Sequence, residues 1–287
     1  MPSSGFEPWR AHPSEVIADE RVTPLQRWQA GGVDAVLGWA WRLDVREVVG
    51  FAVLENVILF LVAVGVGNAA LRLPTVVRLL PDPGRISRLQ AWLAAVAVLM
   101  NSVVTVAGWG LWKAGVIRLD TAATARIAAD FVALLLLMDL LMYAGHALAH
   151  RPALFPFAHA LHHRFVDARP ATLYALHPLE ILGFGGLWLA ALSVHAFSVW
   201  AILGYTAVNL VFGIFGHLGA EVLPLAARRS QVFRWIATPT LHAGHHVQPA
   251  YNLGFYTSIW DRLLGTLDPG YDRRRVAALP PRYPSLA

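Results

Sequence analysis

The residues of this 287-residue chain most suggestive of chemistry are nine histidines that recur in closely spaced groups. They form an HxxxH pair, two HxxHH triplets and one single residue: His146 and His150; His159, His162 and His163; His242, His245 and His246; and His217. Neutral imidazole is a ligand of iron, zinc, copper and nickel, whereas magnesium and calcium prefer oxygen. Because this set exceeds the four ligands of a zinc site, it indicates two metal ions.

Membrane helices are the elements that must position these histidines. The hydrophobic fraction is 56% and only 14% of the residues are charged, which is atypical of a soluble protein. Residues 48–71 and 89–112 contain one charge and none, and each exceeds the roughly 20 residues that span a bilayer. Residues 127–145 form a third span. The uncharged residues 181–220 are long enough for a helical hairpin that turns near 193–198.

The order of the spans brings the nine histidines to one side. The third span ends at the first pair, the polar stretch 151–178 carries the first triplet, and the hairpin returns to His217. We exclude His195, at the far turn roughly 30 Å away across the hydrocarbon, and His12 in the N-terminal tail. The fold class predicted is an all-α integral membrane bundle of four to five transmembrane helices, with a helical cap that carries the histidine cluster.

Charge and composition suggest an orientation and a source. Arginine and lysine are nearly twice as numerous on the histidine side of the spans, so the positive-inside rule places the cap in the cytosol. All but one of the 23 basic residues are arginine, which suggests a GC-rich bacterial genome and an inner-membrane location. The net charge of +5 lacks the patterning of nucleic-acid binding. Residues 24–46 are predicted to form an interfacial helix anchored by Trp28, Trp39 and Trp41.

Two polar residues precede the first histidine pair at helical spacing. Asp139 and Tyr143 lie on the same face of the third span as His146 and His150. An acid within a membrane helix is a functional hypothesis by default. We therefore predict that Asp139 accepts the free N–H of a ligating imidazole, and that Asp139 and Tyr143 are catalytic residues.

The ordered combination of motifs resembles the sterol desaturase and fatty acid hydroxylase superfamily of integral-membrane di-iron enzymes. The resemblance covers roughly residues 139–268. It rests on Asp139 and Tyr143 before the histidine pair, both triplets, His217, the segment His177-Pro178-Leu179-Glu180, and the segment WDRLLGT at 260–266. It implies two non-haem irons, and an enzyme that uses dioxygen and two external electrons to hydroxylate or desaturate a C–H bond of a sterol-type or fatty-acyl lipid.

The resemblance also adds His177 as a tenth metal ligand, with the alternative that it marks a helix start before Pro178. Together, the predicted spans and the resemblance divide the chain into an N-terminal tail with the interfacial helix (1–46), N-terminal transmembrane helices (47–126) and a catalytic domain (127–287). Two positions depart from the pattern of many members, Ala147 in place of an arginine and Leu253 in place of a tyrosine. These departures leave the substrate subclass open.

Electrons are expected from a separate reductase and electron carrier, because the chain has no Gly-rich nucleotide motif and no cysteine. An acidic carrier would dock by electrostatic steering on a basic surface made of Arg228, Arg229, Arg273, Arg274 and Arg275, and the alternative is contact with anionic lipid. Glu180 and Glu221 are further acids expected near the ligands. Asp261 and Arg262 are expected to pair and brace the last helix.

Two other classes of membrane protein also carry histidine clusters. A zinc protease needs a general-base glutamate beside its ligands, as in HExxH, and the segment 146–150 has none. A histidine-rich metal transporter lines a path through the bilayer with histidines and acids. The transporter is the alternative that we carry forward, although the histidines here gather on one surface.

Overall fold

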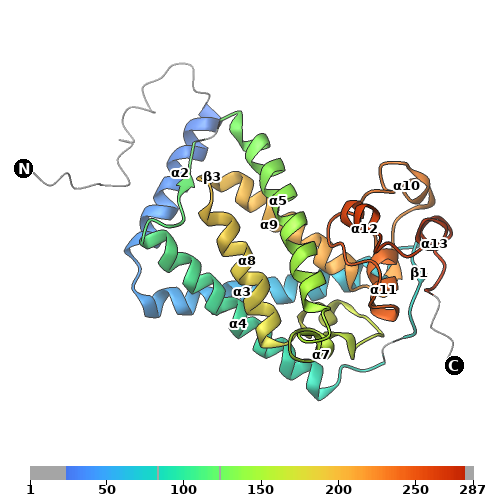
Figure 1. Ribbon diagram of the computed structural model, residues 1–287. Helices are drawn as coiled ribbons and strands as arrows, with labels where there is room; N and C mark the ends of the chain where they lie inside the picture. The colour runs from blue at the N-terminus through green and yellow to red at the C-terminus, as the bar shows by residue number, and fades with distance from the viewer. Residues whose placement is uncertain (1–23, 83, 123, 282–287) are drawn as a thin grey trace, which may run out of the picture.

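Long apolar helices dominate the computed structural model, which describes residues 24–82, 84–122 and 124–281 (Figure 1). The helices long and apolar enough to cross a membrane are α3 (Val45–Ala70), α4 (Arg88–Lys113), α5 (Arg126–Ala149) and α9 (Val199–Gly216), four within the described residues. The shorter α8 (Pro178–Ser193) forms the hairpin with α9. The predicted helical membrane bundle is confirmed, with the hairpin turn where the sequence placed it.

Local sequence signals set where these helices begin. Asp44 and Glu47 form a capping box at the start of α3, and Ser87 and Gln90 form another at the start of α4. In each box the two side chains satisfy backbone N–H groups that a helix start leaves unpaired. Pro178 occupies the first turn of α8, where its missing N–H has no cost.

Glycines allow the bundle helices to approach closely. A Cβ atom at Gly185 of α8 would collide with Val104 of α4, and one at Gly145 of α5 would lie 2.7 Å from Leu187 of α8. Helix α8 therefore packs tightly against both α4 and α5. Large apolar side chains such as Leu61 and Leu136 face outward and are 60% and 56% exposed, as expected where lipid is the solvent.

Helix α2 (Pro24–Arg42) confirms the predicted N-terminal helix. Its C-terminal end docks on α4, because the carbonyl of Ala40 accepts from Trp109 Nε1 at 3.0 Å and that of Trp41 accepts from Lys113 Nζ at 2.6 Å. Its interfacial position stays a prediction. His12 and the side chain of Trp28 lie outside the described residues.

Short elements form a cap at one end of the bundle and two small strand pairs (Figure 1). Strand β1 (Val77–Arg78) pairs antiparallel with β4 (Ala220–Glu221), and β2 (Leu119–Asp120) pairs parallel with β3 (Phe197–Ser198). The cap and its connections contain α6 (Phe155–Ala158), α7 (Ala160–His163), the 3-10 helix η1 (Pro170–Tyr174), α10 (Leu225–Arg229), α11 (Pro239–Val247), α12 (Ile259–Leu264) and α13 (Tyr271–Ala277).

Candidate metal centre

The nine histidines of the sequence motifs gather in two adjacent groups. One group holds His146, His150, His159, His163 and His245; the other holds His162, His217, His242 and His246. Within each group the ring nitrogens that could bind metal lie within 4.8 Å of one another. Each HxxHH triplet contributes to both groups, so the triplets join the two groups into one centre.

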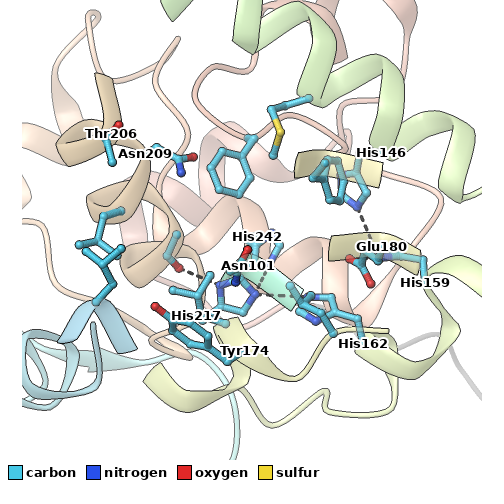
Figure 2. A pocket seen from close by; sticks show the side chains of 18 of the residues that line it. Asn101, His146, His159, His162, Tyr174, Glu180, Thr206, Asn209, His217 and His242 are labelled. Atoms are coloured by element: carbon cyan, nitrogen blue, oxygen red, sulfur yellow. Dashed lines mark hydrogen bonds and ion pairs between the residues drawn. The ribbon is translucent and has the colours of Figure 1, made fainter. Parts of the chain in front are cut away.

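Several separate elements deliver these side chains. The C-terminal end of α5 carries His146 and His150, and α7 with the residue before it carries the first triplet. His217 is the C-cap of α9, and α11 carries the last triplet. Figure 2 shows His146, His159, His162, His217 and His242 directed toward a common space.

Backbone carbonyl groups fix the protonation of several rings. The Nδ1 atoms of His146, His217 and His245 lie 2.8, 2.7 and 2.8 Å from the carbonyl oxygens of Leu253, Gly213 and Tyr251. A carbonyl can only accept a hydrogen bond. Each Nδ1 must therefore carry the proton, which leaves a lone pair on Nε2.

The free nitrogens then face one another without a hydrogen atom between them. His162 Nδ1 also lies against a carbonyl, that of Ala175 at 3.3 Å, and its Nε2 is 3.3 Å from Nε2 of His217. Other buried ring nitrogens have no hydrogen-bond partner: His150 Nε2, both nitrogens of His163, His245 Nε2 and His246 Nδ1. Converging lone pairs in a buried space are unfavourable unless a cation lies between them, and a ring held through its other N–H is the usual form of a histidine ligand. The donor set fits metal ions.

Burial keeps the imidazoles neutral. Loss of solvent lowers the pKa of His163 to about 3 and the pKa of His217 to about 4. Burial, together with neighbouring imidazoles, also lowers the pKa of His242 and of His246. The rings are therefore in their ligand form at neutral pH.

This shift predicts an acid-sensitive metal-free protein. The folded-state pKa values of His163 and His217, about 3 and about 4, lie below the ordinary value of about 6.5. Below pH about 6.5 the unfolded state binds more protons than the folded state, so the free energy of unfolding should decrease as the pH falls from about 6.5 to about 4. Above pH about 6.5 these histidines should add no further pH dependence. The thermal midpoint of chelator-treated protein at pH 7.5, 6 and 5 measures this, with about 1.4 kcal/mol lost per pH unit for each such histidine. An unchanged midpoint at pH 5 would contradict the burial of neutral rings.

Glu180 is the acid in contact with the histidine groups. Its Oε1 lies 2.7 Å from Nδ1 of His159, and both side chains are buried. A carboxylate in this position orients a ligating imidazole and raises its basicity. The expectation that Glu180 lies near the ligands is confirmed.

His177 is not brought into either group. It is the N-cap of α8, and its Nδ1 accepts a hydrogen bond from the backbone N–H of Leu179 at 3.2 Å. Its assignment as a tenth ligand is wrong in this geometry, and the alternative of a residue that starts the helix is the one observed. The cap sets the first turn of α8, which carries Glu180.

Asp139 contacts no imidazole, so the predicted hydrogen bond to a ligand is also wrong. Its carboxylate accepts from the backbone N–H of Thr257 at 3.1 Å, from Thr257 Oγ1 at 2.6 Å and from Trp260 Nε1 at 3.0 Å. Tyr143, one turn along α5, bonds through its hydroxyl to Thr266 Oγ1 at 2.9 Å. Both side chains anchor the C-terminal segment to α5.

Asp261 connects that segment to the histidines. Its carboxylate accepts from the N–H groups of Leu253 and Gly254, both at 2.8 Å, and the carbonyl of Leu253 receives Nδ1 of His146. Asp261 does not pair with Arg262 as expected, because Arg262 binds Asp272 at 2.7 Å. Nothing in the sequence spacing signals that the carbonyl of Leu253 holds a ring.

We therefore expect Asp139→Ala to affect stability more than metal binding. The change leaves the N–H of Thr257 and Nε1 of Trp260 without their acceptor, and each lost bond should cost about 1–3 kcal/mol. The thermal midpoint should fall clearly, while the amount of metal retained per folded chain should stay the same. If the variant lost its metal at an unchanged midpoint, Asp139 would have to act directly on the metal-binding histidines.

Glu221 and the arginines of the cap hold the last triplet in place. Glu221 accepts from Thr240 Oγ1 at 2.7 Å and so fixes the start of α11, and burial raises its pKa. Arg228, Arg274 and Arg275 are buried, and Arg228 donates to the carbonyl of Val276 at 2.6 Å. The prediction of a basic docking surface is therefore wrong for these three residues, because their side chains lie inside the cap.

His195 lies at the far turn, as expected, outside both groups. Its Nε2 is 3.4 Å from Asp130 of α5, whose other carboxylate oxygen accepts from the N–H of Ser198 at 2.8 Å. Asp130 thus ties the α8–α9 turn to the start of α5. Neither residue contributes to the metal centre.

A cavity of about 280 Å³ extends from the histidines into the bundle (Figure 2). His146, His159, His162, His217 and His242 form one part of its wall, and most of the remaining wall is apolar, including Leu59, Met142, Leu173, Phe184, Leu210 and Phe255. An apolar molecule in this cavity would lie within reach of the histidines. Sequence patterns gave no indication of its lining, because the residues come from many helices.

Comparison with known proteins gives consistent results. Residues 131–266 match the fatty acid hydroxylase family. The chain is 30% identical over 148 residues to cholesterol 25-hydroxylase of Rattus norvegicus, covering 50% of this chain and 48% of that protein. It is 27% identical over 157 residues to Delta(7)-sterol 5(6)-desaturase of Eremothecium gossypii, covering 52% and 40%.

A third relative is a very-long-chain aldehyde decarbonylase of Oryza sativa subsp. indica, 32% identical over 139 residues, which cover 45% of this chain and 22% of the rice protein. The matched segments thus span less than half the length of these curated relatives. No solved structure matches the chain significantly.

Proposed function

Since the chain belongs, through residues 131–266, to the sterol desaturase and fatty acid hydroxylase superfamily, we propose that it is a membrane-bound di-iron oxidoreductase. It uses dioxygen and two external electrons to hydroxylate or desaturate a C–H bond of a sterol-type or fatty-acyl lipid. The observation that carries the proposal is the opening of an apolar cavity directly onto two groups of buried, neutral histidines.

The donor set supports two irons. His146, His150, His159, His163 and His245 would hold one ion, and His162, His217, His242 and His246 the other. Imidazole nitrogen suits iron, and the absence of cysteine excludes thiolate ligands. When bound, the two irons would supply the activation of dioxygen that no side chain can provide.

The residues of the chain would orient the rings and the substrate. Glu180 holds His159 through Nδ1, and the carbonyl of Leu253 holds His146. The apolar wall of the cavity, with Met142 and Phe184, would exclude water and hold an alkyl chain or ring beside the histidines. Proximity of the C–H bond to the centre is what the protein contributes. Asp139 and Tyr143, first predicted as catalytic residues, would act indirectly by anchoring the C-terminal segment.

The partners and the location are part of the proposal. A separate reductase and electron carrier would deliver the two electrons, and the cap would face the cytosol of a bacterial inner membrane. The excess of arginine on the side of the cap supports this orientation. The exposed Arg229 and Arg273 are the remaining members of the proposed docking surface.

Metal analysis and lipid analysis together test the function. Protein purified without oxygen should contain iron, and lipids from cells that express the chain should differ by mass spectrometry from those of cells that lack it. A gain of one oxygen atom would identify hydroxylation, and a loss of two hydrogen atoms would identify desaturation. Zinc in place of iron, with unchanged lipids and altered cellular metal content, would favour the transporter instead.

A further inference from the structure

The cavity beside the histidines reaches the outer surface of the bundle at Thr206. Thr206 of α9 lines the cavity and is at the same time an exposed residue of its helix. Figure 2 shows Thr206 on the side of the cavity away from His146, His159 and His162. One part of the cavity therefore lies at the histidines, and another part lies at the surface of α9.

Most boundaries between neighbouring helices of the bundle are closed by direct contacts. Helices α3 and α4 are joined by Ser102 Oγ, which donates to the carbonyl of Ala52 at 3.2 Å. The glycine contacts described above close the boundaries of α8 with α4 and with α5. Leu134 and Met138 of α5 belong to the same buried core cluster as Tyr205 of α9. The boundary between α3 and α9 is the one that remains.

Helices α3 and α9 meet close to the cap. A Cβ atom at Gly67 of α3 would lie 3.3 Å from Cγ2 of Ile214 of α9, and Ala63 belongs to the same core cluster as Ile214. Farther from the cap, Leu59 of α3 and Thr206 of α9 both line the cavity. Because Thr206 is also exposed, the cavity reaches the surface along the boundary between α3 and α9.

Leu59 and Thr206 lie at the same depth in the bundle. Leu59 is eleven residues before Ala70, where α3 ends, and Thr206 is eleven residues before His217, the C-cap of α9. Eleven residues correspond to about 16 Å of helix, which is roughly half of the 30 Å hydrocarbon core of a bilayer. The cavity therefore reaches the surface near the middle of the membrane, where the surrounding molecules are hydrocarbon chains.

The polar atom at this position already has a partner. Thr206 Oγ1 donates to the carbonyl of Ile202 in its own helix at 2.9 Å, so a molecule that passes is not required to hydrogen-bond to it. Leu59 and Leu210 supply apolar side chains beside it. A hydrocarbon can therefore pass without separating a polar group from its partner, whereas a charged group would first have to enter the hydrocarbon core, at a high cost.

We propose that the boundary between α3 and α9, lined by Leu59, Thr206 and Leu210, is a lateral entrance to the cavity. Its occupant is an alkyl chain or ring of a lipid dissolved in the bilayer, which enters near the membrane midplane and lies along about 16 Å of α9 to reach His217. This inference rests on the proposed function and deepens it, because it identifies where the substrate comes from. Thr206 and Leu59 set the rate of entry and take no part in holding metal.

Photolabelling with a hydrocarbon measures entry directly. Dodecane with a diazirine on its sixth carbon is mixed with the purified full-length protein, and light flashes at increasing delays attach it to neighbouring residues, which peptide mass spectrometry identifies. Val211, which is 44% exposed on α9, reports the arrival of the probe at the outer surface. Phe255, on the cavity wall, reports its entry. In the wild type, label should appear at Val211 first and at Phe255 after a delay.

Bulky side chains at the entrance should lengthen this delay. Thr206→Trp should lengthen it about tenfold, which corresponds to about 1.4 kcal/mol added to the barrier, because the large ring has to move aside. The final extent of labelling at Phe255 should stay the same, since the cavity beyond is unchanged. Thr206→Phe is a second, smaller variant should tryptophan disturb folding. Leu203→Trp is the matched control, since Leu203 is 54% exposed on the same helix and lies outside the cavity wall; it should keep the delay of the wild type.

The labelling requires neither metal nor turnover, so its outcome is separate from that of the proposed function. A wild type without label at Phe255 would overturn the entrance even if the protein holds iron and oxidises lipid. Equal delays in the wild type and both Thr206 variants, or an equally long delay in Leu203→Trp, would do the same.

A variant of Leu59 distinguishes the two sides of α3. Leu59 also borders an outer groove between α2, α3 and α4, whose lining does not include Thr206. Leu59→Trp should lengthen the delay as Thr206→Trp does; a delay in Leu59→Trp alone would place the entrance at that groove and overturn the proposal. Delays in both variants of a protein that neither holds iron nor oxidises lipid would support the entrance and overturn the proposed function.

Discussion

Replacing either His245 or His162 with alanine should remove one of the two irons that we propose for the histidine groups. His245 belongs to the five-membered histidine group and His162 to the four-membered group, and both side chains are buried. Because an alanine leaves no donor in their place, each variant should retain about one iron per chain in place of about two and lose turnover by more than about 100-fold. Metal analysis of anaerobically purified protein measures the first effect, and lipid mass spectrometry measures the second.

Two other histidines provide matched controls for this experiment. His195→Ala should retain both irons, because His195 lies at the far turn against Asp130. His177→Asn should do the same, because asparagine is a favoured N-cap residue and can replace the contact of His177 with the N–H of Leu179. Loss of iron from either control variant would show that the replaced histidine is a metal ligand after all. If His245→Ala and His162→Ala kept both irons, the two groups would not be metal sites.

Removing the carboxylate of Glu180 is the second change with a large expected effect. Glu180→Ala leaves Nδ1 of the buried His159 without its partner at 2.7 Å, so the ring loses both its orientation and part of its basicity. Loss of such a partner typically weakens metal affinity 10–100-fold. Retained iron measured against increasing chelator concentration should show a shift of about this size.

A glutamate within a membrane-spanning helix serves as a control that separates this effect from a general change in charge. Glu55 lies in α3 and contributes to a different pocket, away from the histidines. Glu55→Gln should therefore leave the chelator concentration at half-release unchanged, while Glu180→Gln should give an intermediate shift because it keeps an acceptor oxygen. Equal behaviour of Glu180→Ala and wild type would show that His159 needs no carboxylate.

Much of the bundle follows from local sequence properties. The spans predicted at 48–71 and 89–112 coincide with α3 and α4 to within three residues at each end, because an uninterrupted apolar run and a capping residue are readable without tertiary contacts. The hairpin turn was also located, since 181–220 has about twice the length of one crossing. The two-residue strand pairs were not foreseen, because their partners are far apart in the sequence.

Predictions of contacts were less successful where several partners compete. Asp139 does share a helix face with His146, but its carboxylate accepts hydrogen bonds from Thr257 and Trp260 of the C-terminal segment instead. Arg262 forms its salt bridge with Asp272, and the predicted pairing with Asp261 does not occur. Arg228 and Arg275 are buried although charge alone suggested an exposed surface. Helical spacing predicts which face of a helix a residue lies on, but it does not predict which side chain that residue will bind.

The sequence by itself determined the membrane helices, the identity of the nine histidines and their convergence on one end of the bundle, since hydrophobic length and chain direction are sufficient for these. Only the tertiary structure decided how the triplets divide between two groups, which carbonyls and carboxylate hold the rings, and that His177 caps a helix. It also decided which residues line the cavity beside the histidines. These features depend on the packing of distant segments, where small differences in distance determine which donor meets which acceptor.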